Sequence, residues 1–168
     1  MSLNLIIEAL AGSHDRSAFS CGVPVLDRYL REQANQDIKR RVSNCFVAVD
    51  RNNGVIAGYY TLAASSVPIT SLPEDQTKRL PRYPTLPAIL IGRLAVHTLY
   101  QGQRVGSALI IDALQRSTRA APASFALIVD AKDEQATAFY RKHGFIPFES
   151  SQLSLFLPIA TALKLFGS

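Results

Sequence analysis

Residues 89–119 read ILIGRLAVHTLYQGQRVGSALIIDALQRSTR, and this stretch decides the fold. The run Ile89–Val96 has the length and the β-branched content of a strand that is buried on both faces. A short polar loop follows, and apolar residues then recur at helical spacing from Val105 onward. The loop brings glycine and small residues to the start of this helix, where free backbone N–H groups and the helix dipole favour a bound phosphate. The stretch therefore predicts a strand, a phosphate-binding loop and a helix, with a pyrophosphate as the expected ligand.

The chain after this helix predicts a second strand parallel to the first. Residues 125–131 form an apolar run, and the helix between the two strands is the connection that parallel strands require. Asp133 has the position of an N-cap for a further helix, which Gly144 should close. Two short strands are expected at 145–148 and 153–157, before an apolar tail.

The N-terminal third of the chain predicts a strand, a helix and a hairpin. Residues 3–10 read as a short strand. After Pro24, apolar residues fall on one stripe of a helix whose other side is basic and polar. These residues are Leu26, Tyr29, Leu30, Ala34 and Ile38. Residues 44–50 and 55–64 are apolar runs around an Asn53-Gly54 turn, which is typical of an antiparallel hairpin.

Five prolines between residues 65 and 87 predict an extended loop, because proline lacks the N–H group that a central strand or a long helix needs. This loop is either functional or a plain surface excursion, and the sequence favours neither. Together the elements predict an α/β (α+β) fold in one domain, residues 1–168. We expect a mixed sheet of about six or seven strands with helices on both faces.

The 168-residue chain has a formal net charge of +5, and its excess positive charge lies in two segments. Residues 28–41 hold five basic residues against two acidic ones, and residues 78–93 hold four basic residues and no acidic one. Such concentration suits a polyanionic partner, because each neutralised phosphate releases counterions. A solvated charged face explains the same pattern, and on charge alone this plainer interpretation is slightly favoured.

Cysteine, histidine and the N-terminal sequence argue against several classes of protein. Cys21 and Cys45 lack metal-ligand spacing and the three histidines are scattered, so we expect buried cysteines and no metal site. The chain has no apolar run long enough for a membrane span and no secretory signal at its N-terminus. These features predict a cytoplasmic protein that does not use a membrane.

Two motifs resemble the GNAT superfamily of acyl-CoA-dependent N-acetyltransferases. The loop Gln101-Gly-Gln-Arg-Val-Gly106 resembles the superfamily's cofactor loop, Gln/Arg-x-x-Gly-x-Gly/Ala, although Arg104 replaces the middle glycine. The run Phe139-Tyr-Arg-Lys-His-Gly-Phe145 resembles its second signature, an aromatic pair in a helix followed by Gly-Phe and a strand. The layout from Leu5 to Leu157 is also similar to the GNAT fold. Arginine at position 104 has a Cβ penalty if its backbone is left-handed, but its charge suits a phosphate.

A narrower set of motifs resembles the GNAT toxins of bacterial toxin–antitoxin pairs. These motifs are Phe19-Ser-Cys-Gly22, Leu26-Asp-x-Tyr-Leu30, Gly58-Tyr-Tyr-Thr-Leu62, Arg82-Tyr-Pro84, Gly92-Arg-Leu-Ala-Val96 and Val129-Asp-Ala-Lys-Asp-Glu134. The resemblance implies an enzyme that transfers acetyl from acetyl-CoA to the amino group of aminoacyl-tRNA and so blocks translation. It also implies a ribbon-helix-helix antitoxin as partner, and a homodimer.

The resemblance gives roles to particular residues. Tyr140 matches the general acid that protonates the CoA sulfur, and a tyrosine with the usual pKa of about 10 holds its proton at neutral pH. The acetyl-CoA site is implied to comprise Leu94, Ala95, Val96, Gln101, Gly102, Gln103, Arg104, Val105, Gly106, Ser107, Asp133, Ala136 and Phe139. The basic residues implied to contact tRNA are Lys39, Arg40, Arg41, Lys78, Arg79, Arg82 and Arg93.

The central strand contains no carboxylate that would serve as a general base. This favours an α-amino acceptor, with a usual pKa of about 7.7 to 8.0, over a lysine with a pKa of about 10.4. His97 is a conceivable base, although its place at the strand end favours an incidental role. Two other functions stay open: a GNAT enzyme that acetylates a protein N-terminus or a small-molecule amine, and a GNAT-fold binding protein without catalysis.

Overall fold

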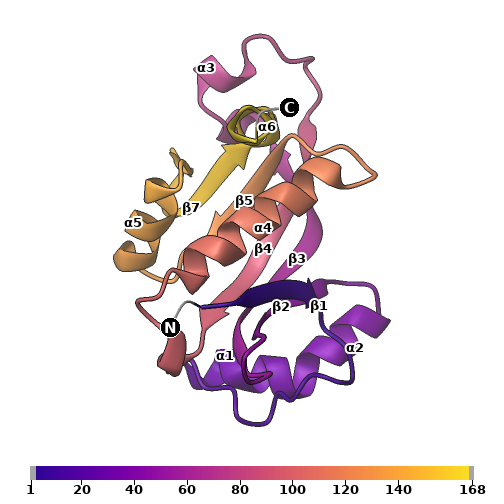
Figure 1. Ribbon diagram of the computed structural model, residues 1–168. Helices are drawn as coiled ribbons and strands as arrows, with labels where there is room; N and C mark the ends of the chain where they lie inside the picture. Colours follow the sequence, from indigo (N-terminus) through magenta and orange to yellow (C-terminus); the bar gives the residue numbers. More distant parts are fainter. Residues whose placement is uncertain (1–2, 167–168) are drawn as a thin grey trace. The chain divides into compact units, whose positions relative to one another are not determined.

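The computed structural model describes residues 3–166, which form two compact units. The first unit comprises the residues up to 63 together with 92–112, and the second comprises 64–91 together with the residues from 113 onward. Strands β3 (Ile56–Pro68) and β4 (Thr85–Val96) and helix α4 (Val105–Arg119) contribute residues to both units (Figure 1).

Seven strands hydrogen-bond in the order β1-β2-β3-β4-β5-β7-β6, and the mixed sheet confirms the predicted fold class. Strand β4 runs parallel to β5 (Ala126–Asp130), as the strand-helix-strand order predicts. The other recorded pairs are antiparallel. They involve β1 (Leu5–Ala9), β2 (Asn44–Asp50), β3, β6 (Ile146–Phe148) and β7 (Ser151–Pro158).

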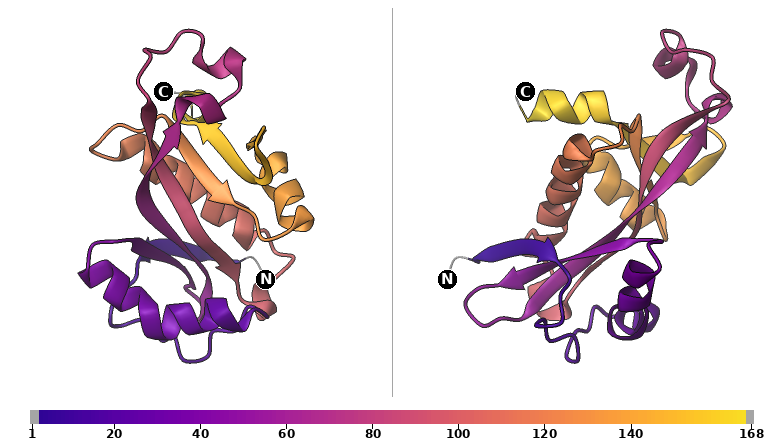
Figure 2. Two further views of the ribbon diagram at one scale, coloured as in Figure 1. Left: turned by 180° about the vertical axis from the view of Figure 1, so that it is seen from behind. Right: turned by 90° about the vertical axis from the view of Figure 1, so that its right-hand side faces the viewer.

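In the first unit, a helix in three segments covers the strands of the predicted hairpin (Figure 2). The segments are α1 (Pro24–Arg28), a π-helical turn η1 (Tyr29–Gln33) and α2 (Ala34–Lys39). In the π turn the Ala34 N–H bonds to the Tyr29 carbonyl, five residues back instead of four. The predicted apolar stripe is confirmed, because Tyr29, Leu30 and Ala34 are buried and Leu26 and Ile38 are partly buried against the same core. The sequence did not reveal the π turn.

Side chains from β3, β4, β5, β6 and β7 form a hydrophobic cluster in the second unit. Its buried residues include Val67, Leu86, Ile128 and Phe156. Helix α5 (Glu134–Lys142) precedes β6, and the expected apolar tail forms helix α6 (Ile159–Leu165). Helix α4 buries the apolar residues that recur from Val105 onward: Val105 and Leu109 in the first unit, Ala113 and Leu114 in the second.

The prediction of an extended loop over residues 65–87 is wrong at both ends. Strand β3 continues to Pro68 and β4 begins at Thr85, with a 3-10 turn, η2 (Ile69–Ser71), and a short helix, α3 (Glu74–Thr77), between them. Pro68 is the last residue of its strand, and Pro87 precedes the first β4–β5 pair, Ala88 with Ala126. The Pro87 carbonyl still accepts a hydrogen bond from the Phe125 N–H at 2.8 Å, so Pro87 stays bonded to the segment that leads into β5.

Strand β4 is also less buried than predicted. Ile91 and Ala95 are buried within the predicted run, Gly92 is exposed, and the remaining residues are half-buried. The prediction of a strand buried on both faces is therefore wrong, because Leu90 borders an open pocket instead of a second apolar layer. None of the helices in residues 3–166 has the length and apolar character that crossing a bilayer requires.

Candidate functional site

The loop between β4 and α4 is fastened to its surroundings by Gln101. The side-chain amide of Gln101 donates to the Val96 carbonyl and to the Cys21 carbonyl, each at 3.1 Å. Between Val96 and Gln101 lies a 3-10 turn, η3 (Thr98–Tyr100), whose cap is His97. Leu94–Val96 and the predicted loop thus lie next to each other within the first unit.

The loop contains two residues in the left-handed region of backbone space. Gly102 has φ +81°, and Arg104 has φ 64°. Glycine adopts this conformation without strain, whereas the Cβ of arginine makes it cost roughly 1–2 kcal/mol. The GNAT pattern has glycine at position 104, and glycine is the residue that adopts a left-handed backbone most easily. Arg104 directly precedes Val105, the first residue of α4, and its carbonyl accepts the Ala108 N–H at 3.1 Å.

His97 is buried at the end of β4 and has a structural role. Its Nδ1 atom accepts a hydrogen bond from the Leu99 N–H at 3.1 Å, and its ring meets Phe19 and Tyr100 edge-on. The Nδ1 lone pair is therefore occupied. These contacts favour the incidental interpretation of His97 over that of a general base.

Gly58 allows β3 and β4 to approach each other at the predicted acetyl-binding segment. A Cβ atom on Gly58 would lie 2.8 Å from the Ala95 carbonyl oxygen and 3.1 Å from a Leu109 methyl group. No side chain fits there unless the backbone of β4 moves. The position of Ala95 therefore depends on a glycine in the neighbouring strand.

Helix α5 holds the second predicted group in the second unit. Asp133 caps the helix, because its carboxylate accepts the Ala136 N–H at 2.8 Å, and Gly144 follows the C-terminus with φ +96°. Both predicted ends of this helix are confirmed. Asp133, Ala136 and Phe139, which the resemblance assigns to the cofactor, thus lie on the same short element as Tyr140.

Tyr140 is buried among aromatic rings. Its ring centroid lies 5.3 Å from that of Phe139 and 5.7 Å from that of Phe145, and its residue is 8% exposed. Burial penalises the phenolate and raises the pKa of Tyr140 to about 12. The phenol therefore keeps its proton throughout the neutral range, as a general acid requires.

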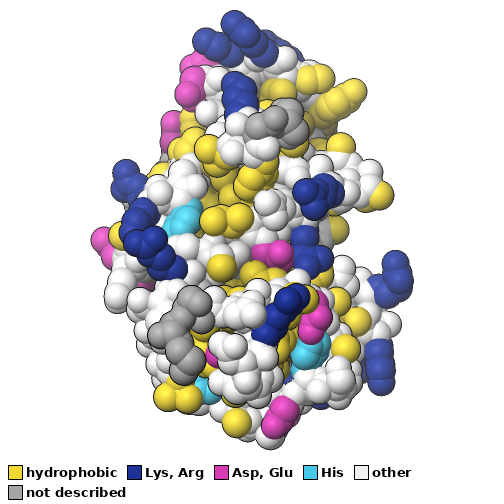
Figure 3. Space-filling model, in the orientation of Figure 1, with side chains coloured by type: hydrophobic (Ala, Val, Ile, Leu, Met, Phe, Trp, Pro, Cys, Tyr) yellow, Lys and Arg dark blue, Asp and Glu magenta, His cyan; other side chains and the backbone are white. Residues whose placement is uncertain are grey.

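Of the seven residues predicted to contact tRNA, six are exposed, and the seven are distributed over both units. Lys39, Arg40 and Arg41 follow one another at the end of α2 in the first unit. Lys78, Arg79 and Arg82 lie in the second unit, where basic side chains gather over the α3 segment (Figure 3). Each cluster faces solvent, and the acidic Glu74 and Asp75 of α3 lie close in sequence to the second one.

Arg93 differs from the other basic residues because it packs inside the first unit. Its guanidinium carbon lies 3.6 Å from the centroid of the Tyr29 ring, which is a cation–π contact. The Tyr29 hydroxyl donates to Asp37 at 2.7 Å, and this bond is the main reason that the pKa of Asp37 is lowered. Arg93 thus stabilises the first unit, a role that its sequence context did not indicate.

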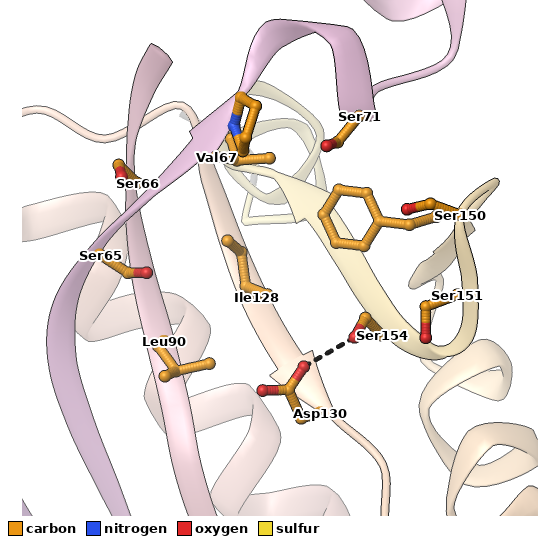
Figure 4. A pocket seen from close by; sticks show the side chains of 12 residues that line it. Ser65, Ser66, Val67, Ser71, Leu90, Ile128, Asp130, Ser150, Ser151 and Ser154 are labelled. Carbon is orange, nitrogen blue, oxygen red and sulfur yellow. Dashed lines mark hydrogen bonds between the residues drawn. The ribbon is translucent and has the colours of Figure 1, made fainter.

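A carboxylate to which the sequence motifs assign no role lies at the end of β5. Asp130 is the last residue of this strand, and its Oδ1 atom accepts a hydrogen bond from the Ser154 hydroxyl at 2.8 Å (Figure 4). Cross-strand pairing of β5 with β7 places these two residues opposite each other. In the sequence, Asp130 interrupts the apolar run 125–131 and belongs to the motif Val129-Asp-Ala-Lys-Asp-Glu134. Among residues 3–166, no group of three or more His, Cys, Asp or Glu side chains could hold a metal ion.

Comparison with known sequences relates the chain to acetyltransferases. Residues 41–147 match the model of the acetyltransferase (GNAT) domain. A probable toxin TacT of Sinorhizobium fredii is 30% identical over 96% of this chain and 95% of its own length. A tRNA-acetylating toxin of Mycobacterium tuberculosis is 34% identical over 94% of each chain.

Comparison with solved structures gives the same result. AtaT complexed with acetyl-methionyl-tRNAfMet has a TM-score of 0.90 and 29% identity, and the match covers 97% of this chain and 99% of that one. AtaTR bound with acetyl-CoA has a TM-score of 0.82 and 29% identity over 96% and 98% of the two chains. A mutant AtaT toxin bound to the C-terminus of the antitoxin AtaR has a TM-score of 0.82 and 27% identity over 98% and 99%.

Proposed function

Because the chain belongs to the GNAT family of acetyltransferases, we propose that it is the toxin of a type II toxin–antitoxin pair and acetylates the amino group of aminoacyl-tRNA. The observation that carries this proposal is the relationship to the tRNA-acetylating toxin, which extends over 94% of both chains. The nitrogen of an acetylated amine is an amide nitrogen and is no longer nucleophilic. Such an aminoacyl-tRNA cannot accept the growing peptide, so translation stops.

The two units act as one GNAT domain, residues 1–168, in this proposal. The family match supports this, because residues 41–147 include parts of both units. The substrate class also implies that the protein works in the cytoplasm, where charged tRNA is used. We further propose a ribbon-helix-helix antitoxin as its partner and a homodimer as its active form; the AtaT–AtaR complex supports an antitoxin of some kind.

Acetyl-CoA is the proposed acetyl donor, and its thioester supplies the carbonyl carbon that the amine attacks. The backbone of Leu94–Val96 binds the pantetheine arm and polarises the acetyl carbonyl, while Gln101–Ser107 binds the pyrophosphate. Residues Asp133, Ala136 and Phe139 contact the remaining part of the cofactor. Two features suit a phosphate at this loop: the first turn of α4 carries no acidic residue, and the basic Arg104 directly precedes it.

Tyr140 is the proposed general acid for the departing thiolate. A free thiol has a pKa of about 8.5, so proton transfer from a phenol of pKa about 12 to a solvated thiolate is uphill. The same apolar surroundings also destabilise a thiolate, which raises the pKa of the thiol that forms and narrows the gap. The proton of Tyr140 is then transferred while the sulfur departs, and not after its departure.

The acceptor in this proposal is an α-amino group, which needs little help to lose its proton. Its usual pKa of about 7.7 to 8.0 leaves a useful neutral fraction at physiological pH. Exposed basic residues hold the polyanion to which the amine is attached. They are Lys39, Arg40, Arg41, Lys78, Arg79 and Arg82, and the half-buried Arg93 completes the proposed set.

The deciding experiment incubates the protein with labelled acetyl-CoA and matched charged and uncharged tRNA. We expect label in the charged sample alone, and we expect it to appear on the amino acid after the ester is hydrolysed. Label on a peptide N-terminus or on a small amine, but not on charged tRNA, would point to another GNAT enzyme. No heat on titration with acetyl-CoA would leave a binding protein.

A further inference from the structure

The second unit contains a hydroxyl-lined pocket that none of the roles above uses (Figure 4). Its volume is about 250 Å³, and all its lining residues belong to this unit. Six serines supply the polar part of the wall: Ser65, Ser66, Ser71, Ser150, Ser151 and Ser154. The apolar part of the wall comprises Val67, Pro68, Leu90, Ile128 and Phe148. A pocket of this size holds an amino-acid residue with an ester.

Asp130 is the single charged residue that lines the pocket. One of its carboxylate oxygens accepts the Ser154 hydroxyl, and the other points to the Leu90 side of the pocket (Figure 4). Strands β3, β4, β6 and β7 contribute no other titratable side chain to the wall. The pocket therefore favours a ligand with a positive charge or with hydrogen-bond donors, and it disfavours an anion.

We propose that this pocket binds the aminoacyl end of the charged tRNA, with the α-ammonium group on Asp130 and the amino-acid side chain against Leu90, Ile128 and Phe148. This inference rests on the proposed function, whose acceptor combines an ammonium group, an ester and a compact side chain. The chain path supports it, because β5 ends at Asp130 and Asp133 then caps the helix that carries Tyr140. Asp130 is a positioning residue that binds the acceptor before it is deprotonated.

The proposed contact has a consequence that a merely structural carboxylate would not have. A negative charge beside the ammonium group stabilises its protonated form and raises the pKa of the bound amine. Replacing Asp130 by asparagine keeps the size and the bond from Ser154 but removes the charge. The amine should then bind more weakly and lose its proton more easily. The variant should therefore have a higher KM, which hinders the reaction. The acid limb of its pH profile should lie at lower pH, which favours the reaction.

The test compares Asp130→Asn with Glu149→Gln, which removes an exposed carboxylate from the same unit outside the pocket. The substrate is total bacterial tRNA charged with one labelled amino acid at a time. For Asp130→Asn we expect KM for charged tRNA to rise about tenfold. We also expect the midpoint of the acid limb of kcat to fall by about one pH unit. The Kd for acetyl-CoA should stay unchanged for both variants.

A second variant tests the pocket independently of the charge on Asp130. Ser65→Leu narrows the pocket and leaves the charge of Asp130 in place, and we expect it to raise KM most for the largest amino acids. If Asp130→Asn and Ser65→Leu both match Glu149→Gln while the wild-type protein acetylates charged tRNA, the pocket proposal is wrong and the proposed function stands. If the wild-type protein acetylates no charged tRNA, the proposed function itself fails.

Discussion

The side-chain amide of Gln101 donates a hydrogen bond to the backbone carbonyl of Val96 at 3.1 Å, so the predicted cofactor loop is tied to the end of β4. A second bond of equal length joins the same amide to the Cys21 carbonyl. We expect Gln101→Ala to weaken acetyl-CoA binding roughly fivefold, because two partly exposed hydrogen bonds contribute about 1 kcal/mol together. Calorimetry measures this Kd. Gln36→Ala, which removes one exposed 3.4 Å bond to Glu32, should leave the Kd unchanged.

Arg104→Gly should stabilise the protein, because it removes the Cβ from a left-handed residue. Glycine also makes the unfolded chain more flexible, so the net gain is about 0.5–1 kcal/mol. For a chain of this size, that corresponds to a rise in Tm of about 1–4 °C. Arg104→Ala is the control, since it removes the charge and keeps the Cβ. Equal stability of the glycine and alanine variants would show that strain is not the cause.

Tyr140→Phe should lower kcat about 100-fold and leave the Kd for acetyl-CoA unchanged, because it removes the acidic proton and preserves the ring. Rapid-mixing assays with labelled acetyl-CoA measure the chemical step. Tyr60→Phe is the matched control: it removes a phenol hydroxyl that donates to Asp112 at 2.5 Å. That control should lose stability and keep its kcat. A Tyr140→Phe enzyme with normal kcat would end the assignment of the general acid.

The raised pKa of Tyr140 fixes the alkaline limb of the pH profile. The group ionises with a pKa of about 12 in the folded protein and about 10 when unfolded, so the protonated acid persists in the native enzyme well above pH 10. We expect kcat to rise as the amine deprotonates and then to stay level up to about pH 10. The same shift contributes stability that is complete below pH 10 and is lost as the pH rises toward 12. Stopped assays and urea titrations across pH 7–11 measure the two effects.

Charge reversal should separate tRNA binding from cofactor binding. With Lys78, Arg79 and Arg82 changed to glutamate, we expect weaker tRNA binding and a salt dependence that is shallower by up to about three units of slope. The Kd for acetyl-CoA should not change, because these residues precede β4 and lie outside the cofactor loop. Arg51→Glu with Arg119→Glu, two exposed positions outside both clusters, is the control. Unchanged tRNA acetylation by the triple variant would remove this cluster from the interface.

Local signals predicted the parts of the fold that short stretches control. Asn53-Gly54 predicted the hairpin, and Asp133 and Gly144 predicted both ends of α5. Apolar periodicity predicted the buried sides of the helices, since Leu30 and Leu109 are completely buried. Each of these signals acts over a few residues and needs no partner from elsewhere in the chain.

Features that depend on partners distant in sequence were not predictable. The missing N–H of Pro87 argues against a central strand and predicts a loop. Pro87 nevertheless belongs to β4, and its carbonyl accepts a hydrogen bond from the Phe125 N–H. The Arg93–Tyr29 contact joins residues 64 positions apart, and composition gave no hint of it. The position of Asp130 opposite Ser154 depends on the pairing of β5 with β7. The sequence predicts a Cβ penalty at Arg104 only if its backbone is left-handed, and the structure shows that it is.

The π turn at Tyr29–Gln33 lets the helix hold one residue more than regular winding would. Because the Ala34 N–H bonds to the Tyr29 carbonyl, deletion of one residue between them would turn this bond into a regular α-helical one and leave Ala34 and Ile38 facing the core. The basic group that begins at Lys39 would then keep its direction. Homologues that lack this extra residue should therefore present the same cationic surface, and a one-residue alignment gap is easier to accommodate at this turn than in the regular segments on either side.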